Sequence, residues 1–524
     1  MSTRGLSRSG LLGISGSKKD VVCVSDKKYI IREPSASSKP RVISLNPKGK
    51  DMSLHTAFSS FVKRVAFCAA LFVCVSATAN LTFADEVRQG YAIVATQSVL
   101  DDADWTKVVD SLRSKYADQY EVAVITWDDS AFDRLKEVFP KYACFVVKPD
   151  EATIDRLVSV WQGTRSLDDD PYGDVIWGII TGYDASDALR LTQVKPMTVE
   201  RACGATSIAT KYFKSSIVFD ETNKNHWRVK EEGKEEEDRN DAPDDTTRAI
   251  AEALNSAQLF VTSGHATENN WSIGYAYRNG FFVAQDDKLF GVPSKESGEK
   301  PFLVEATGSK IQLASGNCLW GNIDKPCCMA LMMIRHANVD MLMGYVVPTW
   351  FGYMGWGVQD YYIEQPGRFT VAEAFYANNQ ALLYLIESNN AAPEGEKLPL
   401  MKSEGLKYDR DVVVLYGDPA WQNALAVQDS GWKQTLESEK ADDGTITWTL
   451  TIDPVETENP YALIDANGSE RSNRPLFQIL PQRVKDVKII ENQDIGAVIT
   501  DDFILIPLST KLPKGKFSLK FTSK

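Results

Sequence analysis

The chain has 524 residues, of which 43% are hydrophobic and 25% are charged, and its formal net charge at pH 7 is −13. This composition is typical of a globular protein with two to four domains. Because nucleic acid binding requires clustered Lys and Arg, the acidic balance argues against DNA or RNA as a partner.

The first 84 residues predict an extension followed by an export signal. Residues 1–51 are rich in Ser, Lys, Arg and Gly, so we expect them to be disordered. Residues 52–84 are typical of a signal peptide that starts at Met52, because two basic residues precede a short apolar run. We therefore expect a secreted, periplasmic or cell-surface protein. A membrane partner is expected only if residues 65–84 are retained as an anchor.

Residues 88–215 alternate between strand and helix patterns. Short apolar runs at 91–95, 121–125, 143–147 and 174–182 are separated by segments with helical spacing of apolar residues. This alternation predicts an α/β fold with a mostly parallel sheet and helices on both faces.

A second α/β subdomain is predicted over residues 216–427. Within it, the stretch 231–245 is almost wholly charged and predicts a solvated loop. A cleavage site for maturation is the alternative interpretation of this stretch. Thr370 and Glu373 have the spacing of a capping box, so a long helix is expected to begin there.

Two apolar runs in this subdomain end on reactive side chains. Residues 257–265 end on His265, and residues 310–318 end on Cys318, each after small residues. In a parallel sheet the carboxyl ends of strands carry the chemistry. A thiol needs a nearby base to become a nucleophilic thiolate, and an imidazole can supply that base and later a proton. The pair predicts a cysteine nucleophile with a histidine acid/base.

These two motifs resemble those of the gingipain family of cysteine peptidases, relatives of the caspases and legumains. The resemblance lies in residues 263–271 and 314–322, and in the 53 positions that separate His265 from Cys318. Two residues depart from the family pattern, since Ala266 stands where Gly is usual and Asn317 where Ala usually precedes the nucleophile.

The resemblance implies a caspase-like fold and an endopeptidase that acts on polypeptides through a thioester on Cys318, with His265 as general acid/base. Backbone N–H groups of Gly264, Ala266 and Cys318 would then form the oxyanion hole. No cofactor is required by such a mechanism. The acidic run 168–170 is a candidate for calcium binding, although such runs are usually solvated surface.

The loop after the next apolar run is the expected substrate pocket. Residues 348–357 mix glycines with large aromatics, and Trp350 and Phe351 are the candidate walls. Recognition of a basic substrate residue would require a carboxylate, for which Asp184 and Asp360 are the candidates.

Residues 428–524 show strict alternation of polar and apolar residues, as in 445–452. This pattern predicts a β-sandwich, and the resemblance implies an immunoglobulin-like domain at this position.

Two other classes of function remain as alternatives. The chain could be a catalytically inactive relative that binds ligands, or a peptide ligase or transpeptidase that transfers the acyl group to an amine. Five cysteines follow the export segment, an odd number that does not suit a disulfide framework.

Overall fold

The computed structural model describes residues 89–277, 279–455, 461, 471, 474–509 and 512–524, which all belong to one compact unit of the chain. The predicted extension at 1–51 and the predicted signal peptide at 52–84 lie outside the described residues. Of the helices in the described ranges, none is long and apolar enough to cross a membrane.

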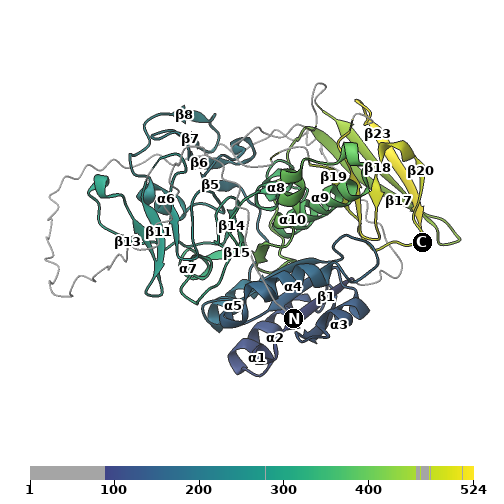
Figure 1. Cartoon of the computed structure of the whole chain (residues 1–524), viewed down its shortest axis with the longest axis horizontal. Coiled ribbons are helices and arrows are strands. Elements are labelled where there is room, and N and C mark those ends of the chain that lie inside the picture. Colours follow the sequence, from purple (N-terminus) through teal and green to yellow (C-terminus); the bar gives the residue numbers. More distant parts are fainter. Residues whose placement is uncertain (1–88, 278, 456–460, 462–470, 472–473, 510–511) are drawn as a thin grey trace, which may run out of the picture. The chain divides into compact units, whose positions relative to one another are not determined.

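A sheet of twelve strands organises the α/β part of the chain (Figure 1). Its strands, in order across the sheet, are β2 (Glu121–Thr126), β1 (Gly90–Ala95), β3 (Tyr142–Val146), β4 (Ile176–Ile180), β16 (Val413–Tyr416), β15 (Val339–Tyr345), β14 (Lys310–Ala314), β9 (Leu259–Thr262), β5 (Arg201–Ala205), β6 (Ser215–Phe219), β7 (Trp227–Lys230) and β8 (Glu237–Arg239). The central strands are buried on both faces, which explains their near-continuous apolar runs.

The sheet consists of two halves that run in opposite directions. Strands β2, β1, β3, β4 and β16 are mutually parallel, and so are β15, β14, β9, β5 and β6. The halves meet where β15 pairs antiparallel with β16. The carboxyl ends of the first half therefore lie at the opposite edge of the sheet from those of the second half.

Helices flank the sheet, so the predicted α/β class with a mostly parallel sheet is confirmed. The helices of the first half are α1 (Gln97–Leu100), α2 (Ala103–Tyr116), α3 (Ala131–Val138), α4 (Ile154–Thr164) and α5 (Ala185–Thr192). Those that follow are α6 (Thr247–Ala253), α7 (Met329–His336), α8 (Tyr353–Tyr362), α9 (Val371–Ala391) and α10 (Leu400–Asp409). Thr370 and Glu373 form the predicted capping box at the start of α9.

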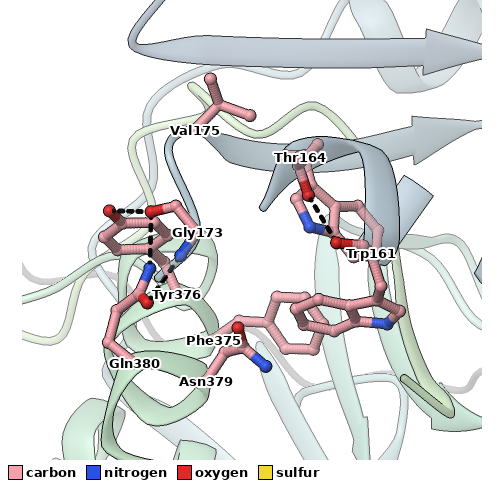
Figure 2. A pocket seen from close by; sticks show the side chains of 9 residues that line it. Trp161, Thr164, Gly173, Val175, Phe375, Tyr376, Asn379 and Gln380 are labelled. Atoms are coloured by element: carbon pink, nitrogen blue, oxygen red, sulfur yellow. Dashed lines mark hydrogen bonds between the residues drawn. The ribbon is translucent and has the colours of Figure 1, made fainter. Parts of the chain in front are cut away.

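Hydrogen bonds join helix α9 to the segment that precedes β4. The backbone N–H of Gly173 donates to Oε1 of Gln380 at 3.0 Å, and the Tyr376 hydroxyl donates to the Gly173 carbonyl at 2.7 Å. Nearby, the Phe375 ring lies 5.2 Å from the Trp161 ring of α4, centroid to centroid (Figure 2). The residues that make these contacts line a small cavity, and they join α9 to α4 and to the segment before β4.

Two segments differ from the sequence predictions. The charged stretch 231–245, predicted as a loop, contains β8, which forms an antiparallel hairpin with β7 at the sheet edge. Between β9 and β14 the chain forms a separate antiparallel sheet that was not predicted. Its strands are β10 (Asn270–Ser272), β11 (Phe281–Gln285), β12 (Lys288–Val292) and β13 (Phe302–Leu303).

The C-terminal residues form antiparallel sheets with their own apolar core. One sheet has the order β17 (Trp432–Lys440), β18 (Ile446–Pro454), β23 (Phe517–Ser523) and β20 (Lys488–Glu491). The other has the order β19 (Leu476–Ile479), β22 (Phe503–Ile506) and β21 (Val498–Ile499). Strand β18 buries alternate residues, as its sequence pattern predicts, and they pack into this core.

Candidate active site

Adjacent parallel strands deliver His265 and Cys318 to one edge of the sheet. Strand β9 pairs with β14 in a register that places Thr262 opposite Ala314. His265 follows β9 by three residues, and Cys318 follows β14 by four. The imidazole is exposed and the thiol is partly exposed, so both are accessible to a substrate.

Each of these side chains has its own neighbour in the structure. The His265 ring stacks on the Tyr275 ring at 5.4 Å between centroids, with 29° between the planes. The Cys318 sulfur accepts a hydrogen bond from the backbone N–H of Thr349 at 3.2 Å. Among the described residues, no hydrogen bond joins the imidazole to the thiol. A donor aimed at the sulfur stabilises the negative charge of a thiolate.

Asn317 connects the two loops that carry this pair. Its side chain is fully buried. Its Oδ1 accepts a hydrogen bond from the Thr262 hydroxyl at 2.7 Å, and its Nδ2 donates to the Gly264 carbonyl at 3.1 Å. The departure from the family pattern at position 317 therefore has a physical role here, because Ala could make neither bond.

The predicted oxyanion hole lies in these same loops. Gly264 has a φ of +97°, a conformation that favours glycine. Leu319, directly after the thiol, has a left-handed φ of +58°, and its N–H donates to the Val347 carbonyl at 3.1 Å. Within the part of the chain that the structure describes, the N–H groups of Ala266 and Cys318 have no hydrogen-bond acceptor. Both are therefore available to an oxyanion.

A buried carboxylate that sequence reasoning missed supports the histidine loop. Glu221 follows β6, and its side chain accepts hydrogen bonds from the hydroxyls of Thr206 and Ser263. Its backbone carbonyl accepts from the N–H groups of Tyr275 and Ala276. Glu221 thus contacts Ser263, just before His265, and also the loop that carries Tyr275, whose ring stacks on the imidazole. No sequence motif marks this residue, because its partners come from three separate segments.

The two aromatic candidates for the pocket differ in their surroundings. Trp350 is 52% exposed, and its ring meets the Tyr408 ring edge-on at 5.7 Å. The Tyr408 hydroxyl donates to the Pro348 carbonyl at 2.9 Å. Phe351, by contrast, is buried against Gly405 of α10, so it supports the loop and does not present a surface to substrate.

The structure does not bring Asp184 to the predicted pocket. Asp184 follows β4, which belongs to the other half of the sheet, so it lies at the edge opposite His265 and Cys318. It caps the N-terminus of α5 and forms an ion pair with Arg335 at 2.8 Å. Burial opposes its ionisation, but hydrogen bonds from Ser186 and Arg335 hold the pKa of Asp184 at about 2.

Asp360 is also unsuited to the predicted role. It lies in α8 with no exposed surface. Its Oδ1 accepts from Arg471 at 2.6 Å, and its Oδ2 accepts from Arg474 at 3.0 Å. Its charge is therefore compensated inside the protein, by residues more than a hundred positions away that sequence patterns could not reveal.

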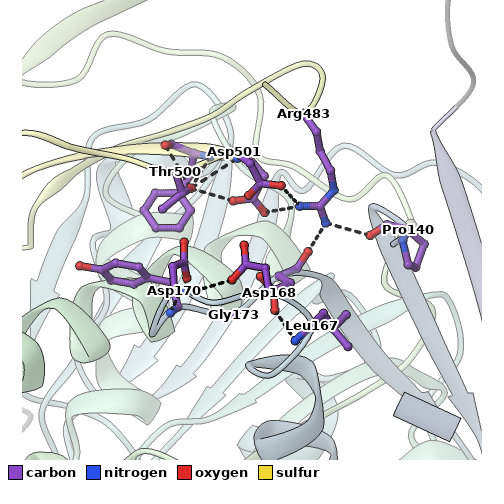
Figure 3. A network of polar contacts seen from close by, with 12 residues as sticks. Pro140, Leu167, Asp168, Asp170, Gly173, Arg483, Thr500 and Asp501 are labelled. Atoms are coloured by element: carbon purple, nitrogen blue, oxygen red, sulfur yellow. Dashed lines mark hydrogen bonds and ion pairs between the residues drawn. The ribbon is translucent and has the colours of Figure 1, made fainter. Parts of the chain in front are cut away.

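Acidic residues near 168–170 do form a cluster. Ligand atoms of Asp168, Asp170 and Asp174 all lie within 4.8 Å of one another. Burial raises the pKa of Asp174 to about 8 and that of Asp170 to about 6. Figure 3 shows Arg483 beside this cluster, where it forms an ion pair with Asp501. The carboxylates suit calcium by ligand type, and calcium binding stays a prediction.

Comparison of the chain with protein-family models, curated proteins and solved structures finds no match.

Proposed function

We propose that the chain is an exported cysteine endopeptidase of the gingipain-like type, with Cys318 as nucleophile and His265 as general acid/base. The observation that supports this most strongly is the pairing of β9 with β14, because it brings an accessible imidazole and an accessible thiol to one edge. Two basic residues before a short apolar run support export by residues 52–84. The resemblance to the gingipain family supports an immunoglobulin-like fold for residues 428–524.

The proposed reaction begins with transfer of the thiol proton to His265 and attack of the Cys318 sulfur on the scissile carbonyl carbon. The carbonyl oxygen becomes an oxyanion, which accepts hydrogen bonds from the N–H groups of Cys318 and Ala266. Collapse of this intermediate breaks the C–N bond, and the imidazolium gives its proton to the leaving amine. A thioester on Cys318 remains.

Water completes the reaction. His265 takes a proton from the water molecule as its oxygen attacks the thioester carbon. The C–S bond then breaks, the carboxylic acid leaves and the sulfur regains a proton. An amine in place of water would yield a new peptide bond, which is the transferase alternative.

Replacement of the nucleophile tests this proposal. Cys318→Ala is expected to lower kcat/KM on a fluorogenic peptide library by about a thousandfold or more, with an unchanged circular dichroism spectrum. Cys327→Ala is the matched control, because Cys327 is another partly exposed thiol in the following segment. Undiminished cleavage by Cys318→Ala would refute the assignment. A thioester that glycinamide consumes and that water hardly hydrolyses, even without added amine, would assign the chain to acyl transfer.

A further inference from the structure

Exposed aromatic side chains border the candidate dyad on two sides. Trp350 is 52% exposed, Tyr408 37% and Tyr275 59%. The rings of Trp350 and Tyr408 touch, so they form one exposed aromatic pair, and exposed apolar groups at one place commonly mark a binding surface.

Trp350 and Tyr408 lie next to the sulfur. Thr349, whose N–H donates to the Cys318 sulfur, is the residue before Trp350. The edge-on contact with Tyr408 and the hydroxyl bond from Tyr408 to Pro348 fix both rings in place. Burial, then the neighbouring Asp409 and Cys318, raise the pKa of the Tyr408 phenol.

Three carboxylates that could bind a basic side chain, those of Asp184, Asp360 and Asp409, are held by other groups. Asp184 lies at the other edge of the sheet and Asp360 is paired with two arginines. Asp409 is fully buried, and its Oδ2 accepts from the Tyr345 hydroxyl and the Met354 N–H. Glu268, in the loop after His265, accepts from the Asn322 amide at 3.2 Å, which does not neutralise its charge, so it is the remaining acidic candidate.

We infer that the site selects an aromatic or large apolar side chain at the P1 position, the residue whose carbonyl is attacked, and that this side chain packs against Trp350 and Tyr408. This inference rests on the proposed function and assigns its substrate class. Ring-on-ring contact would stabilise such a substrate by dispersion and by removal of apolar surface from water. A guanidinium at P1 would find Asp184, Asp360 and Asp409 already held by other groups.

A set of peptides that differ only at P1 tests this inference. We expect kcat/KM for Phe at P1 to exceed that for Ala, Arg or Asp by about tenfold or more. In Trp350→Ala the ratio of Phe to Ala cleavage should fall to within about threefold of unity. Leu400→Ala is the control, because Leu400 is a 78% exposed apolar residue at the start of α10 and should leave the ratio unchanged.

Three outcomes would overturn the inference, and they differ in what they say of the proposed function. A tenfold preference for Arg, or a Phe to Ala ratio unaltered in Trp350→Ala, would overturn the aromatic preference while leaving the peptidase assignment intact. Loss of an Arg preference in Glu268→Gln or Asp409→Asn would then identify the acidic determinant. Cleavage of none of the peptides would overturn both.

Discussion

Asn317 joins the loop that carries Cys318 to the loop that carries His265 through two side-chain hydrogen bonds. Asn317→Ala would leave the buried Thr262 hydroxyl and the Gly264 carbonyl without their partner, at a cost of about 1–3 kcal/mol in unfolding free energy for each group. We also expect slower alkylation of Cys318 by iodoacetamide and a lower kcat with little change in KM.

Asn389→Ala is the control for this prediction, since Asn389 makes two hydrogen bonds, with Leu398 and Ser403, on helix α9 far along the chain. It should reduce stability without slowing alkylation of Cys318. If Cys318 were alkylated at the same rate in Asn317→Ala and in Asn389→Ala, Asn317 would contribute only to folding.

His226 predicts a pH dependence of stability. Its Nδ1 lies 2.9 Å from Asp220 and its Nε2 lies 2.5 Å from Asp238. Burial disfavours the charged ring, but the hydrogen bonds to Asp238 and Asp220 outweigh it and raise the pKa of His226. The protonated ring therefore stabilises the fold fully below its unfolded pKa of about 6.5, and this contribution disappears as pH rises through the higher folded value.

Thermal unfolding of the wild type and His226→Gln across pH 5 to 8.5 measures this contribution. The difference in Tm between the two should be largest at the acidic end and should shrink as pH rises. A difference that grew toward alkaline pH would contradict the predicted sign.

At the scale of elements, helix α8 depends on residues from the C-terminal part of the chain. Arg471 and Arg474 pair with Asp360, and Arg474 also lies over the Tyr353 ring at 3.6 Å and donates to the Tyr353 carbonyl. Tyr353 begins α8 directly after the loop that carries Trp350. The C-terminal residues thus help to hold the loop that carries Trp350.

Arg474→Ala should lower the free energy of unfolding by about 3–5 kcal/mol, because it leaves a buried carboxylate with only part of its compensation. Peptidase activity should fall as well. Lys407→Ala, at an exposed ion pair with Glu404, should change stability by less than about 1 kcal/mol. Chemical denaturation measures both.

The ion pair between Arg474 and Asp360 is tested by a double variant in which both side chains are replaced by apolar ones. In Arg474→Met with Asp360→Leu part of the stability should return, because the buried carboxylate is gone and Arg471 keeps Glu364 as an ion-pair partner at 3.8 Å. If the double variant were as unstable as the sum of the two single changes, the ion pair would not be the cause.

Across the complete fold, the antiparallel pairing of β15 with β16 decides which of the predicted site residues share one edge of the sheet. The apolar runs of β1, β3, β4, β9, β14 and β15 were predictable because residues buried on both faces leave continuous hydrophobic stretches. Those runs carry no signal for the direction in which β16 would pair with β15. The pocket role predicted for Asp184 was therefore wrong, because β4 ends at the edge opposite His265 and Cys318.

Partners that are far apart in the sequence are the second reason why parts of the candidate site could not be predicted. Asp360 follows the aromatic loop in the sequence and was therefore a candidate for the pocket, but its partners come from positions 471 and 474. Glu221 had no motif at all, and the bridging role of Asn317 became visible only when β9 and β14 were adjacent. The positions of His265 and Cys318, by contrast, followed from local strand endings and parallel pairing.

The most direct test of the account is to treat the protein with a peptidyl acyloxymethyl ketone that has Phe at P1 and to locate the adduct by mass spectrometry. We predict stoichiometric modification of Cys318, slowed in His265→Ala, with Cys144, Cys203, Cys327 and Cys328 unmodified. Modification of any of those four thiols in preference to Cys318, or no adduct at all, would contradict the assignment of Cys318 as the nucleophile.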